Sequence, residues 1–308
     1  MLRFGTWNLW NFGRDGVEPR FDTVAAVIRA MNLDVLAVQE VCCDPTRFQA
    51  LAEAAGMTTT LPDGRVAIEP GGHGFGVGLM WNPDRVRPQP TTLRRFPTEF
   101  WHGLVHLGFV VTATGTTATF GSYHASPYER PRRDSEALLV AGRITGSSII
   151  DAGLVGADWN AVGESERLDV DPYADRPWKP VFVHCCEWDT DEHGSPVRWR
   201  ASRTAARNLH AGGLVDVVRH LYDTGRDHRR ADTTGHHPVD PQPCRRIDTV
   251  RATATALAAV VGHYIAGCTS ASGASAAALD VLGKLRELSD HLPSITVVDP
   301  AALPVQAR

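Results

Sequence analysis

The feature that most constrains this chain is a series of short apolar runs, each as long as a β-strand and each ending in a polar side chain. Near the middle of the chain, the run at 153–157 stops at Asp158, and Asn160 follows two residues later. Side chains alternate along a strand, so these two residues project from the same face and can present oxygen atoms to one site. Asp and Asn are also common in turns, so this pair alone supports a site and an ordinary turn about equally.

Three further runs end in the same way: residues 2–7 at Asn8, residues 34–39 at Glu40 and residues 117–123 at His124. A glutamate that ends a buried strand is costly unless a partner or a metal ion stabilises its charge. The alternatives are a solvated Glu40 just past the strand and a purely structural His124. The recurrence of the pattern favours a site built from the ends of several strands.

Apolar residues also recur at helical spacing between these runs. The pattern predicts helices after Pro19, from Pro45 to Gly56, over about 135–144 and near 279–288. Strands joined by turns are expected throughout 57–124, with Glu69 on an early loop, and again at 245–250, 260–266 and 295–298. No repeat period and no linker is visible. The sequence therefore predicts an α/β protein with a single domain over residues 1–308 and an ordered insertion at about 164–202.

Composition limits the function. The chain has 308 residues and a net charge of −4, so any polyanion must be bound locally, through a metal ion or clustered arginines. No stretch approaches the ~18 apolar residues that a membrane span needs, and the first residues lack a signal-peptide core. The six cysteines have neither metal-knuckle nor disulfide spacing, which predicts a reduced, cytoplasmic protein. No obligate protein partner is evident.

The polar groups at or beside the strand ends share one chemistry. They are Asn8, Glu40, His124, Asp158, Asn160, Asp248, Asp290 and His291. Carboxylate and amide oxygens are hard ligands that suit Mg²⁺, with Mn²⁺ as the alternative. A histidine beside a spare carboxylate can form a charge-assisted pair that raises its basicity. No P-loop, serine-hydrolase elbow or cysteine–histidine motif competes, so the set indicates metal-assisted hydrolysis of a phosphoester.

These groups stand in six motifs. In chain order the motifs are Thr6-Trp-Asn8-Leu, Val38-Gln-Glu40-Val, Tyr123-His124-Ala-Ser-Pro, Gly156-Ala-Asp158-Trp-Asn160, Arg246-Ile-Asp248 and Ser289-Asp290-His291. The series resembles the endonuclease/exonuclease/phosphatase superfamily over residues 2–298. That resemblance implies a four-layer αββα sandwich, in which two mixed β-sheets lie face to face with helices outside. The usual Gly-Asp-Phe-Asn of the family is Gly-Ala-Asp-Trp-Asn here, a conservative change.

The resemblance also implies where metal and water would be handled. Glu40 would be the principal Mg²⁺ ligand, with Asn8 and Asp290 close by. His291, paired with Asp248, would handle the proton of the attacking water.

On the phosphate side, the resemblance implies that Asp158 orients or deprotonates the water. Asn160 and His124 would grip the phosphate, and His124 could also protonate the leaving group. Glu69 is a weaker match and could orient His124.

Substrate contacts are predicted from arginines and tryptophans near these motifs. Arg130, Arg132 and Arg133 stand before the third predicted helix, and Trp159 lies within the central motif. Arginines at such a place usually form a solvated first turn, but the N-terminal dipole of a helix favours acids there. An anionic partner for these arginines is therefore an open alternative.

The insertion is predicted to be ordered and to rim the site, because it is too aromatic for a disordered linker. It holds Trp178, Trp188 and Trp199, and Arg198, Arg200, Arg203 and Arg207 are predicted to lead along a helix that ends at Gly212. A plain surface helix is the alternative.

Three functions compete. The leading hypothesis is a Mg²⁺-dependent phosphodiesterase acting on nucleic acid. The second is an enzyme for a small phosphorylated metabolite or a lipid headgroup, which the net charge and the tryptophan-rich insertion favour mildly. The third is an inactive binding protein on the same scaffold, against which stands the fact that all eight polar positions are intact.

Overall fold

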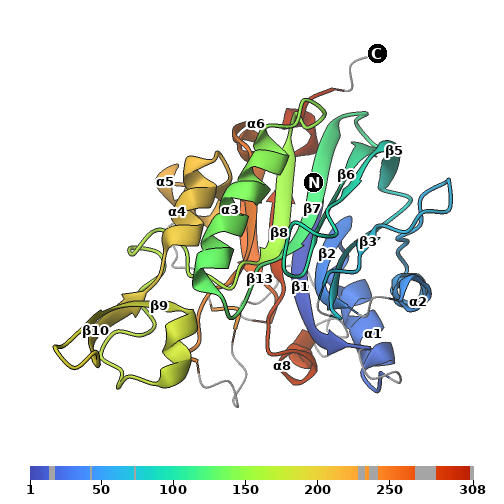
Figure 1. The fold of residues 1–308 in the computed structure, drawn as a ribbon. Coiled ribbons are helices and arrows are strands. Elements are labelled where there is room, and N and C mark those ends of the chain that lie inside the picture. The colour runs from blue at the N-terminus through green and yellow to red at the C-terminus, as the bar shows by residue number, and fades with distance from the viewer. Residues whose placement is uncertain are drawn as a thin grey trace.

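Two six-stranded mixed β-sheets lie face to face with helices on their outer faces (Figure 1). The computed structural model describes residues 1–13, 18–41, 44–72, 74–227, 233–235, 242–267 and 282–305. The strand order is β13-β14-β1-β2-β4-β3 in the first sheet and β11-β12-β8-β7-β6-β5 in the second. The four-layer sandwich predicted from the sequence is therefore confirmed.

The first sheet is built on the parallel pair β1 and β2. Its strands are β1 (Leu2–Phe12), β2 (Val35–Val41), β3 (Ile68–Glu69), β4 (Gly76–Trp81), β13 (Val260–Ile265) and β14 (Ser294–Val298). All other neighbours in this sheet are antiparallel. Glu69 lies in the two-residue strand β3 and not on the expected loop, because Ile68 and Glu69 pair with the otherwise unpaired edge of β4.

The second sheet is built on the parallel pair β7 and β8. Its strands are β5 (Val86–Arg95), β6 (Leu104–Val111), β7 (Thr117–His124), β8 (Gly153–Asp158), β11 (Val215–Asp216) and β12 (Asp248–Ala252). Strand β12 pairs with β8 in antiparallel register, which sets Asp248 opposite Asp158.

The helices follow the predicted periodicity with some differences in length. They are α1 (Phe21–Met31), α2 (Pro45–Ala54), α3 (Arg130–Thr145), α4 (Thr204–Ala211), α5 (Val217–Asp223), α6 (Ala254–Ala259) and α8 (Leu285–Leu288). Helix α3 begins earlier than predicted, since Pro131 fits the first turn of a helix, where an N–H is not needed. The start of the helix predicted near 279–288 lies outside the described residues. No described helix is long and apolar enough to span a membrane.

Alternating side chains divide the core into layers. Phe4 of β1 packs between the sheets, where its ring centroid is 4.8 Å from that of Phe120, whereas Trp7 faces the core beneath the outer helices. The two sheets approach closely beneath the site. A Cβ at Gly156 would lie 2.7 Å from the Thr6 Cβ, so only glycine permits this approach.

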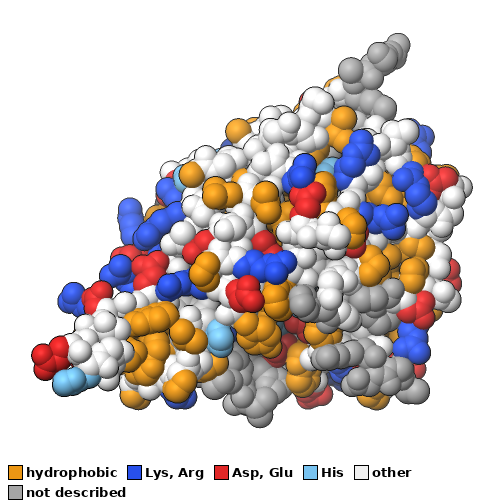
Figure 2. All heavy atoms as spheres, viewed as in Figure 1, with side chains coloured by type: hydrophobic (Ala, Val, Ile, Leu, Met, Phe, Trp, Pro, Cys, Tyr) orange, Lys and Arg blue, Asp and Glu red, His pale blue; other side chains and the backbone are white. Residues whose placement is uncertain are grey.

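The insertion projects from the sandwich as a unit with a small core of its own (Figure 1). It contains a short 3-10 helix (Pro180–His184) and the hairpin of β9 (Cys186–Thr190) and β10 (Pro196–Ala201). The Trp178 ring packs against those of Trp188 and Trp199 at centroid distances of 5.7 and 5.4 Å. Figure 2 shows hydrophobic side chains gathered over this region.

Two arginines of the insertion lie elsewhere than expected. Arg198 and Arg200 belong to β10 and not to a helix, because their backbone pairs with Asp189 and Glu187 of β9. The helix begins only at Thr204, after the hairpin has closed.

Candidate active site

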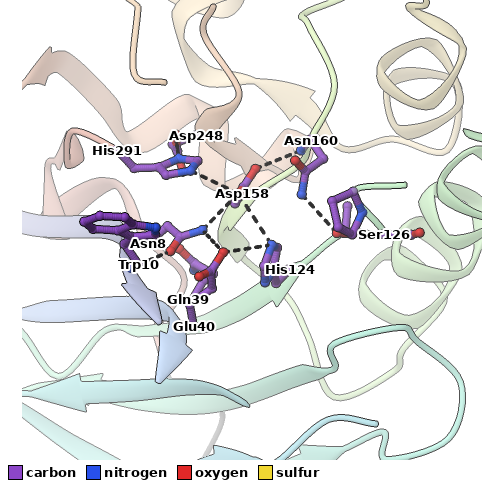
Figure 3. A network of polar contacts seen from close by, with 12 residues as sticks. Asn8, Trp10, Gln39, Glu40, His124, Ser126, Asp158, Asn160, Asp248 and His291 are labelled. Carbon is purple, nitrogen blue, oxygen red and sulfur yellow. Dashed lines mark hydrogen bonds and ion pairs between the residues drawn. The ribbon is translucent and has the colours of Figure 1, made fainter. Parts of the chain in front are cut away.

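The polar strand ends meet at one edge of the sandwich. Asn8 and Glu40 come from the parallel pair of the first sheet, and His124 and Asp158 from the parallel pair of the second (Figure 3). Parallel neighbours end at the same edge of a sheet, and His124 stands directly opposite Asp158 in register. The structure therefore brings together groups that are more than 100 positions apart in the chain.

Asn8 links the two sheets. Its Nδ2 donates to Glu40 Oε1 at 3.0 Å and to Asp158 Oδ2 at 3.0 Å. Its Oδ1 accepts a hydrogen bond from the backbone N–H of Trp10 at 2.9 Å. All three bonds restrict the rotamer of Asn8, so the carboxylates on either side of it are held at a fixed spacing.

Backbone strain concentrates around the site. Glu40 has a φ of 55°, and Trp10, Asn11 and Asn160 have φ values of 50°, 55° and 47°. Residues with a Cβ rarely adopt this left-handed region. At Glu40 the strained turn allows Oε2 to accept the Asn11 N–H at 2.9 Å. Such strain clusters at functional sites, where the surrounding structure holds it in place.

His291 forms a buried pair with Asp248. Its Nδ1 lies 2.8 Å from Asp248 Oδ2. The backbone around His291 is also fixed, since its N–H donates to Ser289 Oγ and its carbonyl accepts from the indole of Trp7. Burial alone would lower the pKa of His291, but the carboxylates of Asp248 and Asp158 outweigh it and raise that pKa well above its ordinary value.

Asp158 stands between two imidazoles (Figure 3). Its Oδ2 lies 3.5 Å from His124 Nε2 and 3.8 Å from His291 Nε2, and its Oδ1 accepts the Asn160 N–H at 2.9 Å. Burial would raise the pKa of Asp158, but the two histidines and the hydrogen bonds lower it. The site therefore keeps an ionised carboxylate flanked by two imidazoles.

Asn160 and His124 form the opposite wall. Asn160 Nδ2 donates to the Ala125 carbonyl at 3.1 Å, and an amide nitrogen carries a second hydrogen that can be donated to a ligand. His124 is 2% exposed, and its ring stacks on that of His102. His102 was not predicted, because a histidine in a loop has no pattern that marks it. Glu69 accepts the Gly71 N–H and has no hydrogen bond to His124 within the described part of the chain.

The carboxylates fit a divalent cation. Asp290 Oδ1 is buried and lacks a hydrogen-bond partner among the described residues. Burial raises the pKa of Asp290, and the nearby charges of Glu40 and Asp158 raise it further. A bound cation would relieve this repulsion, and oxygen donors are those that Mg²⁺ or Mn²⁺ prefers.

A second donor group overlaps this one. Asp158, Asp248 and His291 each offer an atom within 4.8 Å of the others. In that group His291 Nδ1 is already engaged by Asp248, so this nitrogen is not available to a metal ion in the observed arrangement.

The chain was compared with models of known protein families. The model of the Endonuclease/Exonuclease/phosphatase family matches residues 5–291. The chain belongs to this family. The resemblance inferred from the six motifs is thus confirmed, and the chain is a metal-dependent phosphoric ester hydrolase like the other members. A search of curated protein sequences gave no match.

Solved structures of the family share the fold. An AP endonuclease from Archaeoglobus fulgidus has a TM-score of 0.60 at 16% identity, with 97% of this chain and 100% of that chain covered. A 3′ phosphatase from Neisseria, bound to a product DNA hairpin, has a TM-score of 0.59 at 16% identity, with 97% and 100% covered. A mannosyl-6-phosphatase from Bacteroides thetaiotaomicron has a TM-score of 0.58 at 14% identity, with 97% and 99% covered.

Arg133, one of the residues predicted to contact the substrate, is buried. It is 2% exposed, and its guanidinium donates to the carbonyls of Ser126, Pro127 and His184. Its donors therefore join the loop after His124 to the insertion. This environment does not support a substrate-binding role for Arg133.

The other predicted contacts are also engaged. Arg130 donates to the Cys186 carbonyl and lies 5.0 Å from the ring centroid of Trp188, whereas Arg132 pairs with Glu136. Trp159 is 4% exposed and donates to the Thr249 carbonyl. Its side chain follows Asp158 and so points to the opposite face, away from the site.

Buried arginines also fix the loop after Asn160. Arg246 binds Asp169 with two donors at 2.7 and 2.6 Å and reaches Asp216 at 2.6 Å. Burial would raise the pKa of Asp216, but Arg246 and Arg251 lower it to about 2. This network ties the start of the insertion to β12, the strand that carries Asp248.

Proposed function

We propose that this protein hydrolyses phosphodiester bonds of nucleic acid in a reaction that requires Mg²⁺. The observation that carries the proposal is the position of Asp158, whose Oδ2 faces the Nε2 atoms of His124 and His291. Hydrolysis of a phosphodiester needs one proton taken from water and one given to the leaving oxygen. Two imidazoles on opposite sides of one carboxylate suit these two transfers.

In its neutral form, His291 takes the proton of the attacking water at Nε2. Its Nδ1 is hydrogen-bonded to Asp248, which fixes the ring orientation and stabilises the imidazolium that forms. Asp158 orients the water, and its negative charge favours the proton on His291.

Asn160 and His124 hold the phosphoryl oxygens on the other side, and His124 gives its proton to the leaving alkoxide. The proposed metal ligands are Glu40, Asn8 and Asp290, and the bound cation would neutralise charge on the phosphate and polarise it. Mn²⁺ is the alternative cation.

Nucleic acid is the proposed substrate because the chain shares its fold with proteins described as an AP endonuclease and as a phosphatase bound to DNA. Residues 1–308 are proposed to form one catalytic domain that acts in the cytoplasm. No protein partner is proposed.

A second candidate substrate is a small phosphorylated metabolite or headgroup. Two observations favour it. Arg130 and Arg133 are engaged with the insertion's backbone, and residues 164–202 hold nine acidic against five basic side chains. An acidic insertion repels a polynucleotide at low salt.

An activity screen tests the proposal. Plasmid DNA, RNA and a panel of phosphomonoesters would be incubated with Mg²⁺, with Mn²⁺ and with EDTA. We expect cleavage of nucleic acid that depends on the cation and is abolished by EDTA. Hydrolysis of monoesters alone would contradict the nucleic-acid substrate, and hydrolysis of nothing would contradict the function.

Salt dependence separates the two substrate classes. Binding would be measured on the metal-loaded His291→Ala variant, and each phosphate contact adds about 0.7–0.9 to the log–log slope. A polynucleotide should give a slope of several, whereas a small phosphorylated ligand should give a shallow one. A slope near one for every nucleic acid tested would favour the second candidate.

A further inference from the structure

The carboxylates nearest the ring of His124 lie beyond the distance of a good hydrogen bond. His124 Nδ1 is buried and has no hydrogen-bond partner in the part of the chain that the structure describes. Its Nε2 lies 3.5 Å from Asp158 Oδ2 and 3.9 Å from Glu40 Oε1, both longer than a good hydrogen bond. The χ2 torsion of histidine is broad, so these contacts alone do not fix the ring plane.

The ring of His124 stacks on that of His102, a contact that restricts its plane. The two ring centroids are 4.1 Å apart and the planes are inclined by 12°. His102 is 4% exposed, and Phe75 packs beside it with a centroid distance of 5.9 Å. A stacked aromatic pair is stabilised beyond its buried area, which favours one ring orientation.

The backbone that carries His102 is itself fixed against the site. The Gly103 carbonyl accepts the His124 N–H at 3.4 Å. On the other side, a Cβ at Gly71 would lie 2.1 Å from the His102 carbonyl oxygen. Gly71 has a φ of 66°, so this close approach requires glycine.

One buried carboxylate joins the supports of both rings. Glu136 Oε1 accepts the N–H of Trp101, the residue before His102, at 2.6 Å. Its Oε2 accepts the N–H of Ser126 at 3.1 Å and the Tyr123 hydroxyl at 2.8 Å. The segments before His102 and around His124 are thus bound to the same side chain of α3.

We propose that His102 is a positioning residue that acts through its ring stack and keeps His124 Nε2 directed at the leaving oxygen. The inference rests on the proposed function, in which His124 protonates that oxygen. A ring that rotates away leaves the alkoxide without a proton donor. The rate of hydrolysis of an ester whose leaving group departs unprotonated is then unaffected.

The test compares two phosphodiesters. A dinucleotide has an alkoxide leaving group, whereas bis(p-nitrophenyl) phosphate releases a stable phenolate. The variants are His102→Ala, His102→Leu, which fills the space without a planar ring, and His102→Phe, which restores a ring that can stack. His124→Ala serves as the reference for complete loss of the donor, and thermal unfolding of each variant shows that it is folded.

We expect His102→Ala and His102→Leu to lower kcat on the dinucleotide about 10–100-fold, with less than about threefold loss on bis(p-nitrophenyl) phosphate and little change in KM. His102→Phe should restore kcat to within about threefold of the wild type, because stacking and not a ring nitrogen is what matters. In the His124→Ala background, His102→Leu should cost little more.

Equal losses on both substrates would overturn the inference, as would a His102→Phe variant that is as impaired as His102→Leu. Full activity of His102→Leu would overturn it too. Absence of metal-dependent hydrolysis of either substrate by the wild type would instead overturn the proposed function, and the inference with it.

Discussion

His291 and His124 face the same Asp158 oxygen from opposite sides, but the fold holds them by different forces. His291 is fixed by a 2.8 Å contact to Asp248, and its pKa is raised by carboxylates that outweigh its burial. His124 is fixed by a ring stacked at 4.1 Å. A carboxylate partner fixes the tautomer of a histidine and stabilises its protonated form, whereas stacking fixes only its plane. A proton acceptor benefits from the first arrangement.

The same contrast appears in the supports. The backbone at His291 is bonded to Ser289, whose hydroxyl donates to the Asn8 carbonyl of the first sheet. The segments at His102 and His124 depend on Glu136, a side chain of a helix on the second sheet. Damage to one half should therefore leave the other intact, and the predictions below use this independence.

The largest effect is expected from the pair of His291 and Asp248. His291→Ala should lower kcat by about 10²–10⁴ while KM changes little, because the proton acceptor is lost. Asp248→Asn should also lower kcat, but the double variant should cost little more than His291→Ala alone, since Asp248 acts through His291. Steady-state kinetics on a dinucleotide measure all three. Additive losses in the activation barrier would show that the two residues act separately.

Glu40→Gln affects the proposed metal site, which lies between His291 and His124. The substitution keeps the shape of the side chain and removes its charge, so we expect Mg²⁺ affinity to fall by at least about tenfold. Isothermal titration calorimetry on the folded protein measures the change. Glu53→Gln, at an exposed position of α2, is the matched control and should have no effect. Unchanged affinity in Glu40→Gln would remove Glu40 from the metal site.

A third buried histidine shows what happens without a carboxylate. Burial, with a smaller contribution from Arg94, lowers the pKa of His106 on β6 to about 4. The unfolded chain titrates at its ordinary value of 6.5, so the stabilisation is present above pH 6.5 and is lost as pH falls towards 4. The loss should reach about 3 kcal/mol below pH 4.

Denaturant unfolding of the wild type and of His106→Gln at several pH values measures this pH-dependent contribution of His106 to stability. The free energy of unfolding of His106→Gln should fall less steeply between pH 6.5 and pH 4 than that of the wild type. Parallel curves for the two proteins would show that His106 does not titrate in this window.

The smallest effect is expected from Glu136, which holds the segments that carry His102 and His124. Glu136→Gln replaces one accepting oxygen by a donor, so at least one of the N–H groups of Trp101 and Ser126 loses its partner. We expect a loss of about 1–3 kcal/mol in unfolding free energy and reduced activity on the dinucleotide. Glu129→Gln, exposed beside the same helix, is the control. Loss of activity on bis(p-nitrophenyl) phosphate as well would show that the damage reaches His291.

The sequence predicted the sheet strands and the groups at their ends because both depend on local rules. Apolar runs of strand length gave β2 and β8, and the alternation of side chains placed Asp158 inward. The same alternation could have shown that Trp159 points away. The turn-rich pattern places Glu69 on a loop, since a two-residue edge strand has no period to detect.

Tertiary structure alone decided how those groups are held and which of the predicted arginines are engaged within the protein. The stack of His102 on His124 depends on a loop meeting a strand end. The guanidinium of Arg133 donates to the His184 carbonyl of the insertion. Neither relation leaves a periodic trace in the sequence, because each joins segments whose spacing is set by packing and not by the chain. The sequence thus determined which chemical groups are present and at which edge of the sheets they gather. The packed fold determined which of them face one another across the site and which are bound to the protein itself.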